Sequence, residues 1–378
     1  MAYATIDNPL QYFNTVLYTG DIVDGDGTGH DQAITGVGFQ PDWVWHKGRS
    51  HARTHIWADS VRGTGGSPTQ MLGISSQDNG AEINSNTNGW IESLDSDGFT
   101  VTSGNDSSSK SNNAGANGNT YVAWNWKCAT SFSNDASATS VGSIDSSGKI
   151  NADAGIAIIT WTGTGSAGTI AHGLGAVPRF IMVKNRTDAG ADWYCYHPAN
   201  GNTHSILLNS TGAKVGAYSD NWNNTSPTST VFSVGSSNST GGSSGDNMIA
   251  YVFAESTGFS HFGTYVGDAT DANGPFAYTG FKPAFVMLKN TAEASTDWYM
   301  YDNKRGGPAA TVYGNNNKFF LKANTGVAEA NESLHFYSNG FKIKITNNFH
   351  SGNTSKFIYM AFAESPLVNS NGIPTTAR

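Results

Sequence analysis

The chain has 378 residues, including 45 glycines, 10 tryptophans, 15 tyrosines and 19 phenylalanines, but only 13% of its residues are charged and its net charge is −8. This charged fraction is about half of the usual quarter, which excludes a coiled coil, a helical bundle and a charged disordered chain, and a pI of about 5.6 argues against a nucleic-acid binder. No apolar run reaches the roughly 18 residues that span a bilayer, and the start, MAYATIDNPLQYF, lacks the features of a Sec-type signal peptide, so we expect no membrane insertion.

Gly, Ser, Asn and Thr alternate with aromatic and β-branched residues, a mixture typical of short strands joined by loops. We therefore predict an all-β protein. No stretch shows a sustained 3.6-residue period, so helices should be few and short. Cys128 and Cys195 are too few for a disulfide framework, and we expect both to be buried thiols.

Residues 1–17 precede the main part of the first repeat described below, and NPLQYF (8–13) carries too many apolar groups for a solvated tail. We predict an N-terminal docking arm at 1–17, which packs on its own domain or on a partner.

Five landmarks recur three times in the same order along the chain. They are an aromatic strand closed by glycine (LYTG 17–20, TWTG 160–163, TYVG 264–267), a strand that follows a proline (PDWVWHK 41–47, PRFIMVK 178–184, PAFVMLK 283–289), a second aromatic strand (HIWAD 55–59, DWYCYH 192–197, DWYMYD 297–302), a fourth strand (DGFTV 97–101, TVFSV 230–234, NGFKIKI 339–345) and a closing strand (YVAWNWK 121–127, IAYVFAE 249–255, IYMAFAE 358–364). This pattern predicts three copies of one domain.

Each copy is expected to hold seven or eight short strands in about 105 residues, which is typical of a β-sandwich. The closing strands are the most apolar and should lie in mid-sheet, close to the first strands, as in jelly-roll and lectin-like topologies. We predict β-sandwich repeats at 18–128, 156–257 and 258–366, a flexible or loosely adherent Ser/Asp-rich linker at 129–155, and a fraying C-terminal tail at 367–378.

The acidic loop of the first copy comes closest to a metal motif. Asp24, Asp26 and Thr28 match the first three ligand positions of a calcium loop, but no helices flank them and the corresponding loops of the other copies are not uniformly acidic. A solvated hairpin loop is the alternative. His51 and His55 have the i, i+4 spacing of a zinc pair without the intervening glutamate. We expect no cofactor other than this calcium candidate.

Arg49, Arg53 and Arg62 form a basic cluster in the first copy, and Lys47, Lys184 and Lys289 form a series shared by all three copies. These side chains either cap strand ends and pair with nearby acids, or recognise acidic sugars or phosphate on a bacterial surface.

Trp90, Tyr218 and Trp222 lie in polar, turn-rich stretches outside the core pattern. Because sugars stack their C–H faces on such rings, the three are glycan-contact candidates, with the capping of a sandwich edge as the structural alternative.

Polar, low-complexity segments occupy one position in all three copies, between the fourth strand and the closing strand. They are 102–120, 233–247 and 346–356, and they supply the further contact candidates Asn113, Asn238, Asn348 and His350. Since the strands fix both ends of each segment, we expect loops that project from the same end of each sandwich, where binding residues are often found.

No nucleophile elbow is present, and the carboxylates vary between copies. Asp59, His197 and Asp302 fall at equivalent positions, and this change of residue type argues against one chemistry in all three copies. The sequence therefore predicts no enzyme.

Several long motifs carry a family resemblance: FNTVLYTG (13–20), GFQPDWVWHKGRS (38–50), SLDSDGFTV (93–101), HGLGAVPRFIMVKNR (172–186) and YMAFAESP (359–366). The chain resembles the repeat domain of tail-fibre or virion appendage proteins of marine bacteriophages, of the cyanophage and pelagiphage type. The resemblance implies a virion component with a host-adhesion role and supplies no catalytic residues.

We therefore expect a bacteriophage virion structural protein, a tail-fibre or appendage adhesin that contacts host-surface glycans. Its partners would be other virion proteins through the N-terminal arm and a host polysaccharide or outer-membrane receptor, with the protein made in the host cytoplasm and a homotrimer as one assembly. One alternative is a capsid or tail decoration protein that contacts only virion subunits, and a less favoured one is a polysaccharide depolymerase.

Overall fold

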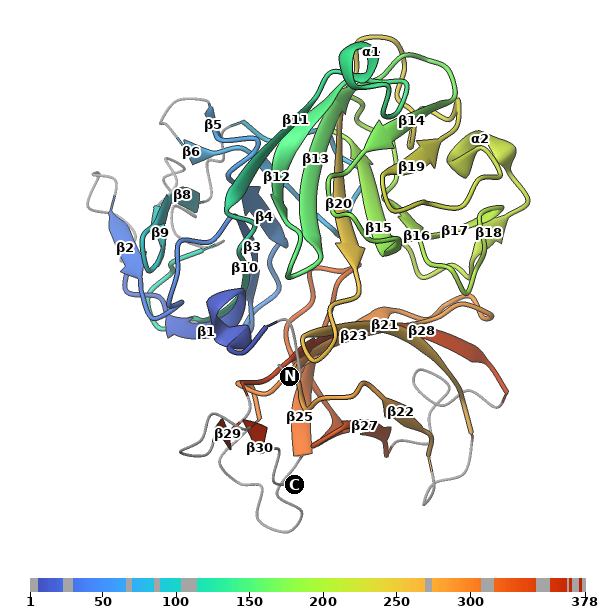
Figure 1. Cartoon of the computed structure of the whole chain (residues 1–378). Helices are drawn as coiled ribbons and strands as arrows, with labels where there is room; N and C mark the ends of the chain where they lie inside the picture. Colours follow the sequence, from blue (N-terminus) through green and yellow to red (C-terminus); the bar gives the residue numbers. More distant parts are fainter. Residues whose placement is uncertain are drawn as a thin grey trace.

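The computed structural model describes residues 6–22, 30–65, 70–84, 89–102, 114–268, 274–306, 316–344, 354–365, 367–368 and 374–375. The protein is all-β, as predicted, and consists of antiparallel sheets in three groups (Figure 1). Helical structure among these residues is limited to η1 (Pro9–Gln11), α1 (Ala136–Thr139) and α2 (Ser219–Trp222). In the described part of the chain no helix is long and apolar enough to cross a membrane.

The N-terminal part (residues 6–128) has a five-stranded sheet in the order β1-β10-β3-β4-β7 and a three-stranded sheet in the order β2-β9-β8. Its strands are β1 (Phe13–Thr19), β2 (Asp31–Ile34), β3 (Trp43–Gly48), β4 (Ile56–Asp59), β5 (Thr64–Gly65), β6 (Gln70–Met71), β7 (Gly73–Ile74), β8 (Trp90–Asp95), β9 (Gly98–Thr102) and β10 (Thr120–Trp126). Val44 and Ala123 of the larger sheet and Phe99 of the smaller one belong to the same buried cluster. Two layers therefore enclose one core, as in a β-sandwich.

The middle part (residues 129–257) has an eight-stranded sheet in the order β11-β12-β13-β20-β15-β16-β17-β18 and a two-stranded sheet formed by β14 and β19. Its strands are β11 (Thr130–Asn134), β12 (Ser146–Asn151), β13 (Ile156–Thr162), β14 (Gly168–Ala171), β15 (Pro178–Asn185), β16 (Tyr194–Tyr196), β17 (His204–Leu207), β18 (Val215–Gly216), β19 (Val231–Val234) and β20 (Asn247–Ala254). Ile181 of the large sheet and Phe232 of the small one share a second buried cluster.

The C-terminal part (residues 258–365) has one eight-stranded sheet in the order β21-β28-β23-β24-β25-β26-β27-β22. Its strands are β21 (Ser260–Val266), β22 (Phe276–Tyr278), β23 (Pro283–Asn290), β24 (Trp298–Asp302), β25 (Asn316–Lys322), β26 (Ala330–Tyr337), β27 (Gly340–Ile343) and β28 (Lys356–Ala363). Val286 of β23 and Phe341 of β27 pack in one cluster although their strands are far apart in this order, so the sheet folds over its own core.

The closing strands lie where the sequence predicts. Each of β10, β20 and β28 pairs with the strand that carries the first landmark of its repeat on one side (β1, β13 or β21) and with the post-proline strand on the other (β3, β15 or β23). The next place in each sheet, beyond the post-proline strand, is also equivalent, since β4, β16 and β24 pair with β3, β15 and β23.

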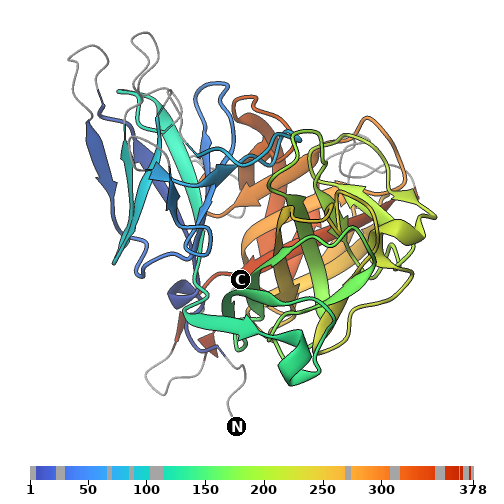
Figure 2. The ribbon, with the colours of Figure 1, turned by 90° about the horizontal axis from the view of Figure 1, so that it is seen from above.

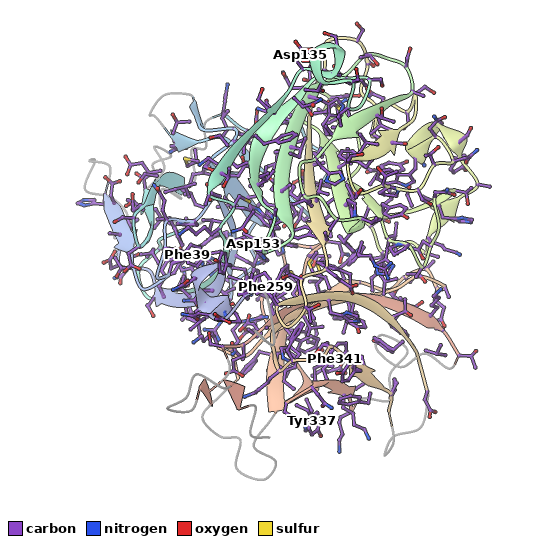
Figure 3. All side chains as sticks on the ribbon, in the orientation of Figure 1. Phe39, Asp135, Asp153, Phe259, Tyr337 and Phe341 are labelled. Atoms are coloured by element: carbon purple, nitrogen blue, oxygen red, sulfur yellow. The ribbon has the colours of Figure 1, made fainter. Side chains whose placement is uncertain are left out.

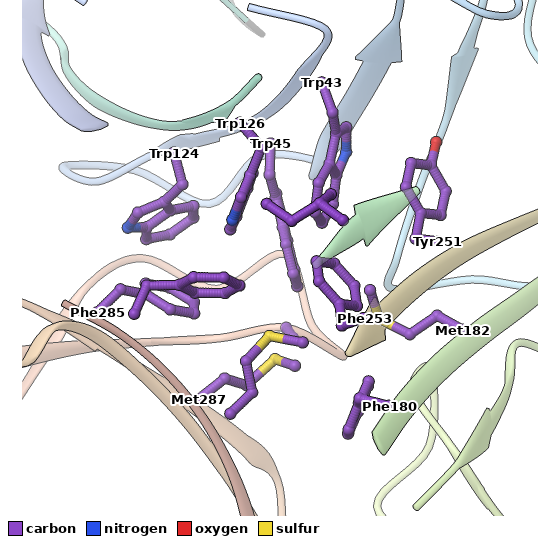
Figure 4. Packing of buried hydrophobic residues seen from close by; sticks show 14 of the residues in the cluster. Trp43, Trp45, Trp124, Trp126, Phe180, Met182, Tyr251, Phe253, Phe285 and Met287 are labelled. Atoms are coloured by element: carbon purple, nitrogen blue, oxygen red, sulfur yellow. The ribbon is translucent and has the colours of Figure 1, made fainter. Parts of the chain in front are cut away.

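A fourth apolar core lies between the three parts (Figure 4). Alternation along β3 explains how one sheet serves two cores, because Trp43 and Trp45 face the central core whereas Val44 faces the core of its own part. Trp43 stacks on Trp126 with ring centroids 4.0 Å apart, and Trp126 lies 5.7 Å from Phe362 of the C-terminal part. Aromatic pairs of this kind each contribute about 0.5–1.5 kcal/mol beyond area burial, so this core holds the parts together.

The expected linker at 129–155 is not a flexible spacer. Its residues form β11, α1 and β12, and β12 pairs with β13 in full register from Ser147↔Thr160 to Asn151↔Ile156. Asp135 caps α1, since its side chain accepts hydrogen bonds from the backbone N–H groups of Ser137 and Ala138. Its Ser/Asp-rich composition therefore reflects strand edges and a helix cap that composition alone does not reveal.

The expected N-terminal arm packs on its own chain, one of the two options that the sequence left open. Phe13 begins β1, which pairs along its length with β10, and both Ile6 and Phe13 are buried in the central core. The described residues of 1–17 are therefore part of the fold. In the tail, β29 (Leu367–Val368) pairs with β30 (Pro374–Thr375), while residues 369–373 and 376–378 lie outside the described part.

The three parts contact one another in a cyclic order, and Figure 2 shows the N-terminal part (blue) beside the other two. A buried lysine at the end of β3, β15 or β23 donates to a backbone carbonyl of another part: Lys47 to Gly326 at 3.1 Å, Lys184 to Asn79 at 3.3 Å and Lys289 to Thr211 at 3.5 Å. We call these contacts the N–C joint, the middle–N joint and the C–middle joint. A ring side chain follows the same direction at each joint: His55 to Lys322 O, Trp193 to Ser75 O and Trp298 to Leu207 O. Each part thus donates these hydrogen bonds to one neighbour and accepts them from the other, so the three parts form a closed ring.

Candidate functional site

Two of the three predicted aromatic contact residues are buried, which corrects the sequence-based expectation. Trp90 is 1% exposed and packs in the N-terminal core, where its ring fills the space beside Gly73. Trp222 is 1% exposed, packs in the core of the middle part and donates its indole N–H to Ser205 Oγ at 2.8 Å. Their polar neighbours in the sequence lie in turns, while the rings themselves face inward.

Tyr218 lies on the surface, as expected, with the residue 55% exposed. It stands at the N-cap position of α2, and its backbone N–H donates to Thr203 O. It remains a contact candidate.

Of the four contact candidates in the loops, the structure describes one. Asn113, Asn348 and His350 lie outside the described residues. Asn238 is described, and its side chain helps to fix the loop before β20. Asn185 Nδ2 donates to the backbone O and to Oδ1 of Asn238 and to Asp246 Oδ2, and Asn238 Nδ2 donates to Asp188. Asn238 is thus already engaged in internal hydrogen bonds.

The basic cluster does not form a free surface patch. Arg62 is buried, and its Nε lies 2.5 Å from Asp59 Oδ2. Arg49 forms a two-pronged ion pair with Glu329 across the N–C joint, with both N–O distances at 3.0 Å. Arg53 donates through Nη1 to Ala52 O. Of the two interpretations of the basic cluster, pairing with nearby acids therefore holds for Arg49 and Arg62, because each guanidinium group already forms an ion pair inside the fold.

The lysine series is also internal. All three side chains are buried, and burial lowers the pKa of Lys47 to about 7 and those of Lys184 and Lys289 to about 8. Each ammonium donates to backbone carbonyls, as in the bonds of Lys184 to Asn185 O and Ala191 O, both at 2.8 Å. These lysines join the parts of the molecule and do not face a ligand.

The metal candidates find no support in the described residues. Asp24, Asp26 and Thr28 lie outside them, and within them no group of three or more His, Cys, Asp or Glu side chains is placed to hold a metal ion. His55 is buried with Nδ1 bonded to the Trp45 indole, so it is not one of a zinc pair. Cys128 and Cys195 are buried free thiols, as predicted, and burial raises the pKa of both.

A polar groove of about 350 Å³ lies across the ends of β11, β12 and β13, in the segment that composition suggested to be a spacer. The side chains that line it carry hydroxyl, amide, carboxylate, indole and guanidinium groups: Ser133, Asn134, Asp135, Asp145, Ser146, Ser147, Thr160, Trp161, Thr162, Arg186 and Asn247. Figure 3 shows the position of Asp135 at the end of the molecule formed by α1.

Strand pairing and a helix cap position the two carboxylates of the groove. Asp145 immediately precedes β12, and its Oδ1 accepts from Ala136 N at 2.9 Å. Asp135 Oδ1 accepts from Ser137 N and Ala138 N, and these hydrogen bonds, with that from the Ser137 hydroxyl first, lower the pKa of Asp135. Each residue uses Oδ1 in these bonds, so its second oxygen is left to accept from a ligand.

Arg186 and Trp161 close the groove on other sides. Arg186 is held by Glu82 of the N-terminal part, with Nη2 2.6 Å from Glu82 Oε2, so the groove lies beside the middle–N joint. Trp161 is 5% exposed and packs edge-on against Phe232 at 5.8 Å. Its buried indole N–H has no hydrogen-bond partner among the described residues. The groove thus combines hydrogen-bonding groups of several kinds with the edge of one aromatic ring, so it could bind a polar ligand.

Sequence reasoning missed Asp135, Asp145 and Trp161. The available signal was the pattern Asp135 followed by ASAT (136–139), an N-cap before small helix formers, which argues against a structureless spacer. The strand TWTG (160–163) gave no indication that Trp161 would border a groove, because that depends on β12 pairing beside it.

Residues 8–366 match the family model described as "Domain of unknown function (DUF7483)". No curated protein and no solved structure matches the chain.

Proposed function

The chain belongs to the DUF7483 family, and from its residues and geometry we propose that it is a bacteriophage virion structural protein, a tail-fibre or appendage adhesin that binds host-surface glycans. The motifs that resemble marine phage appendage proteins, among them GFQPDWVWHKGRS (38–50), support the virion role. The protein would be made in the host cytoplasm and act on the particle.

We further propose that the fold is three tandem, jelly-roll-like repeats of about 105 residues. Equivalent pairing of β3, β15 and β23 with β10, β20 and β28 supports it. Because the three parts already close a ring, several binding faces are presented by one chain, and avidity follows without a homotrimer. A homotrimer would then associate through surfaces outside the three joints.

The polar groove carries the glycan proposal. It combines two carboxylates, several hydroxyl groups and the edge of Trp161 in one hollow. Arg186, the one cation among its described lining residues, is paired with Glu82. With Asp135 and Asp145 unneutralised by a lining cation, the groove suits an uncharged sugar whose hydroxyl groups donate to the carboxylates.

Binding of the purified protein to an array of bacterial surface polysaccharides tests this proposal. We expect wild-type protein to bind an uncharged polysaccharide and the double variant Asp135→Asn/Asp145→Asn to bind about tenfold more weakly, since two charge-assisted hydrogen bonds are lost. Asp153→Asn is the matched control, because Asp153 is exposed in the same part but does not line the groove.

Other outcomes favour the alternatives. Binding to virion proteins with no binding to any polysaccharide would favour a decoration protein. Release of reducing ends or unsaturated sugars would favour a depolymerase, for which Asp135 is a poor general acid because its pKa is lowered.

Docking to the virion through the N-terminal arm remains part of the proposal in altered form. Deletion of residues 1–17 would remove Ile6, Phe13 and most of β1 from the fold, so it no longer serves as a test that spares folding. Deletion of residues 1–5 is the suitable variant. Loss of incorporation into particles with unchanged thermal unfolding would support docking, and normal incorporation would contradict it.

A further inference from the structure

An exposed aromatic edge lies on the C-terminal part, far from the polar groove. Strand β22 is the last strand of its sheet, and its side chains alternate: Ala277 is 4% exposed and packs in the core, whereas Phe276 is 44% and Tyr278 is 64% exposed. Tyr278 is the most exposed large hydrophobic side chain in the described part of the chain. Exposed aromatic rings in adjacent positions of one face are uncommon on a surface that serves only solubility.

The neighbouring strands extend this face. Phe276 pairs with Lys342 of β27, which in turn pairs with His335 of β26, and Tyr278 pairs with Gly340, which pairs with Tyr337. Phe276 lies edge-on to Tyr337 at 6.1 Å, and His335 stacks on Tyr337 at 6.4 Å. We call Phe276, Tyr278, His335, Tyr337, Lys342 and Lys344 the aromatic–basic platform.

Lys342 and Lys344 add positive charge to this face. Along β27, Phe341 and Ile343 are buried in the core, while Lys342 is half-buried and Lys344, the next residue beyond the strand, is exposed. Burial and then the charge of Lys344 lower the pKa of His335 from its ordinary value, so the histidine is neutral at pH 7. The positive charge at neutral pH therefore comes from the two lysines.

The fold itself does not require the platform. Phe341, Phe99 and Phe232 occupy equivalent places opposite Ala277, Ile34 and Ile170. The next pair on the outer face is Phe276↔Lys342 in the C-terminal part, Ala33↔Thr100 in the N-terminal part and Thr169↔Ser233 in the middle part. In the N-terminal and middle parts this position is occupied by small neutral residues, so the fold does not need larger ones there. The aromatic and basic residues of the C-terminal part must therefore serve a purpose other than folding.

We propose that the aromatic–basic platform binds an acidic polysaccharide, whose sugar rings pack on Phe276, Tyr278 and Tyr337 and whose anionic groups contact Lys342 and Lys344. Charge complementarity selects this occupant: the platform carries two lysines, whereas the groove at the opposite end of the molecule carries two carboxylates (Figure 3). Aromatic rings bind the apolar faces of sugars, and ammonium groups bind carboxylates or sulfates. The inference deepens the proposed function by naming a second glycan class and its site.

Affinity electrophoresis of the full chain in gels that contain alginate or uncharged dextran tests the platform. We expect alginate to retard wild-type protein more strongly than dextran, and the retardation to fall as salt rises from about 50 to about 500 mM because screening weakens exposed charge contacts. Tyr278→Ala should weaken alginate binding about fivefold, and Lys342→Gln/Lys344→Gln about tenfold, while dextran binding stays unchanged.

Val177→Ala and Lys214→Gln are the matched controls, because both residues are exposed on the middle part and neither is a contact candidate. Thermal unfolding of each variant shows whether the fold is kept, and an exposed tyrosine should be replaceable without loss. Alginate binding that is unchanged in both platform variants would overturn this inference and leave the proposed function standing. Absence of binding to alginate and to every array polysaccharide would overturn both.

Discussion

The N–C joint and the C–middle joint occupy equivalent positions but differ in chemistry. In the N–C joint, Arg305 is buried with Nε 2.6 Å from Asp302 Oδ2, and the Trp124 indole donates to the same carboxylate oxygen at 3.0 Å. The C–middle joint has His197 and Asn200 at these two places. Both are buried, and the side-chain amide of Asn200 forms no hydrogen bond with the described residues.

This difference shows what holds the ring together. Equivalent positions hold a buried ion pair in one joint and an uncharged pair in the other, so neither pair is the main source of the binding energy between the parts. That energy must come from the aromatic core that the three parts share. The middle–N joint resembles the N–C joint, since Arg62 pairs with Asp59 and Tyr251 donates to that carboxylate at 2.6 Å. The ion pairs instead make two of the joints sensitive to the loss of a single partner.

The largest effect is expected from breaking the ion pair of the N–C joint. Asp302→Asn removes the closest carboxylate of the buried Arg305 guanidinium and leaves only Glu329, at 3.2 Å, to pair with it. The free energy of unfolding, measured by denaturant titration, should fall by about 3–5 kcal/mol. The double variant Asp302→Asn/Arg305→Met, which removes both charges, should recover most of the loss. A loss below about 1 kcal/mol for the single variant would show that the two joints do not differ energetically.

Acid should affect the C–middle joint through His197. Burial, with the charges of Arg179 and Lys356, lowers the pKa of His197 to about 3. Because the unfolded side chain titrates near 6.5, it binds a proton before the folded one does, so stability is lost as the pH falls from about 6.5 toward about 3.

Between pH 7 and pH 4 this loss should reach about 3 kcal/mol for the wild type and be absent for His197→Gln, apart from the contributions of other histidines. Denaturant titrations of both proteins at the two pH values measure the difference. An equal acid loss in both proteins would refute the assignment to His197.

A smaller effect is expected at the rim of the N–C joint. Arg49→Gln removes the two-pronged pair with Glu329 and should cost about 1–2 kcal/mol, since both side chains are more than four-fifths buried. The corresponding place in the C–middle joint holds Thr291, whose carbonyl accepts from Lys214 N. Lys214→Gln should therefore change stability by less than about 0.5 kcal/mol. Equal costs in the two variants would remove the distinction.

The smallest effect is expected at Asn200. Replacement by leucine removes a buried amide that has no partner, so stability should stay within about 1 kcal/mol of the wild type or rise. Thermal unfolding measures the shift. A large loss would indicate a hydrogen bond through bound water, which Asn200→Ala combined with calorimetry would then reveal.

The sequence predicts the parts of the fold that depend on repetition. The nearly continuous apolar runs in PRFIMVK (178–184) and PAFVMLK (283–289), which lack clean alternation, are typical of strands covered on both faces, and β15 and β23 are buried on both. The second core behind them could not be foreseen, because no pattern within one strand tells which neighbour covers its second face. The lysine that ends each strand was recognisable as a recurrent feature, but its carbonyl partners lie about a hundred or more residues away in two of the three joints.

The candidate sites were predicted less well, and for a physical reason. Polar neighbours made Trp90 and Trp222 look exposed, although Trp90 begins β8, Trp222 ends α2, and both rings are buried in a core. The exposed rings of Phe276 and Tyr278 stand in FAYTG (276–280), which reads as an ordinary strand. Exposure of alternate residues depends on whether a strand has a second layer on that side, and β22 at the sheet edge has its core on one side only.

The direction of the joints has a consequence for synthesis of the chain. The middle part holds the N-terminal part and the C-terminal part holds the middle part, so these two joints can form in the order in which the ribosome delivers the residues. The N–C joint runs the other way, because Lys47 and His55 must wait for Gly326 and Lys322. Until then the first part exposes Trp124 and Trp126, whose rings pack on Phe285 of the C-terminal part. The C-terminal part, which is synthesised last, therefore covers the apolar face that the N-terminal part leaves exposed. A nascent chain interrupted before the C-terminal part should be a substrate for chaperones.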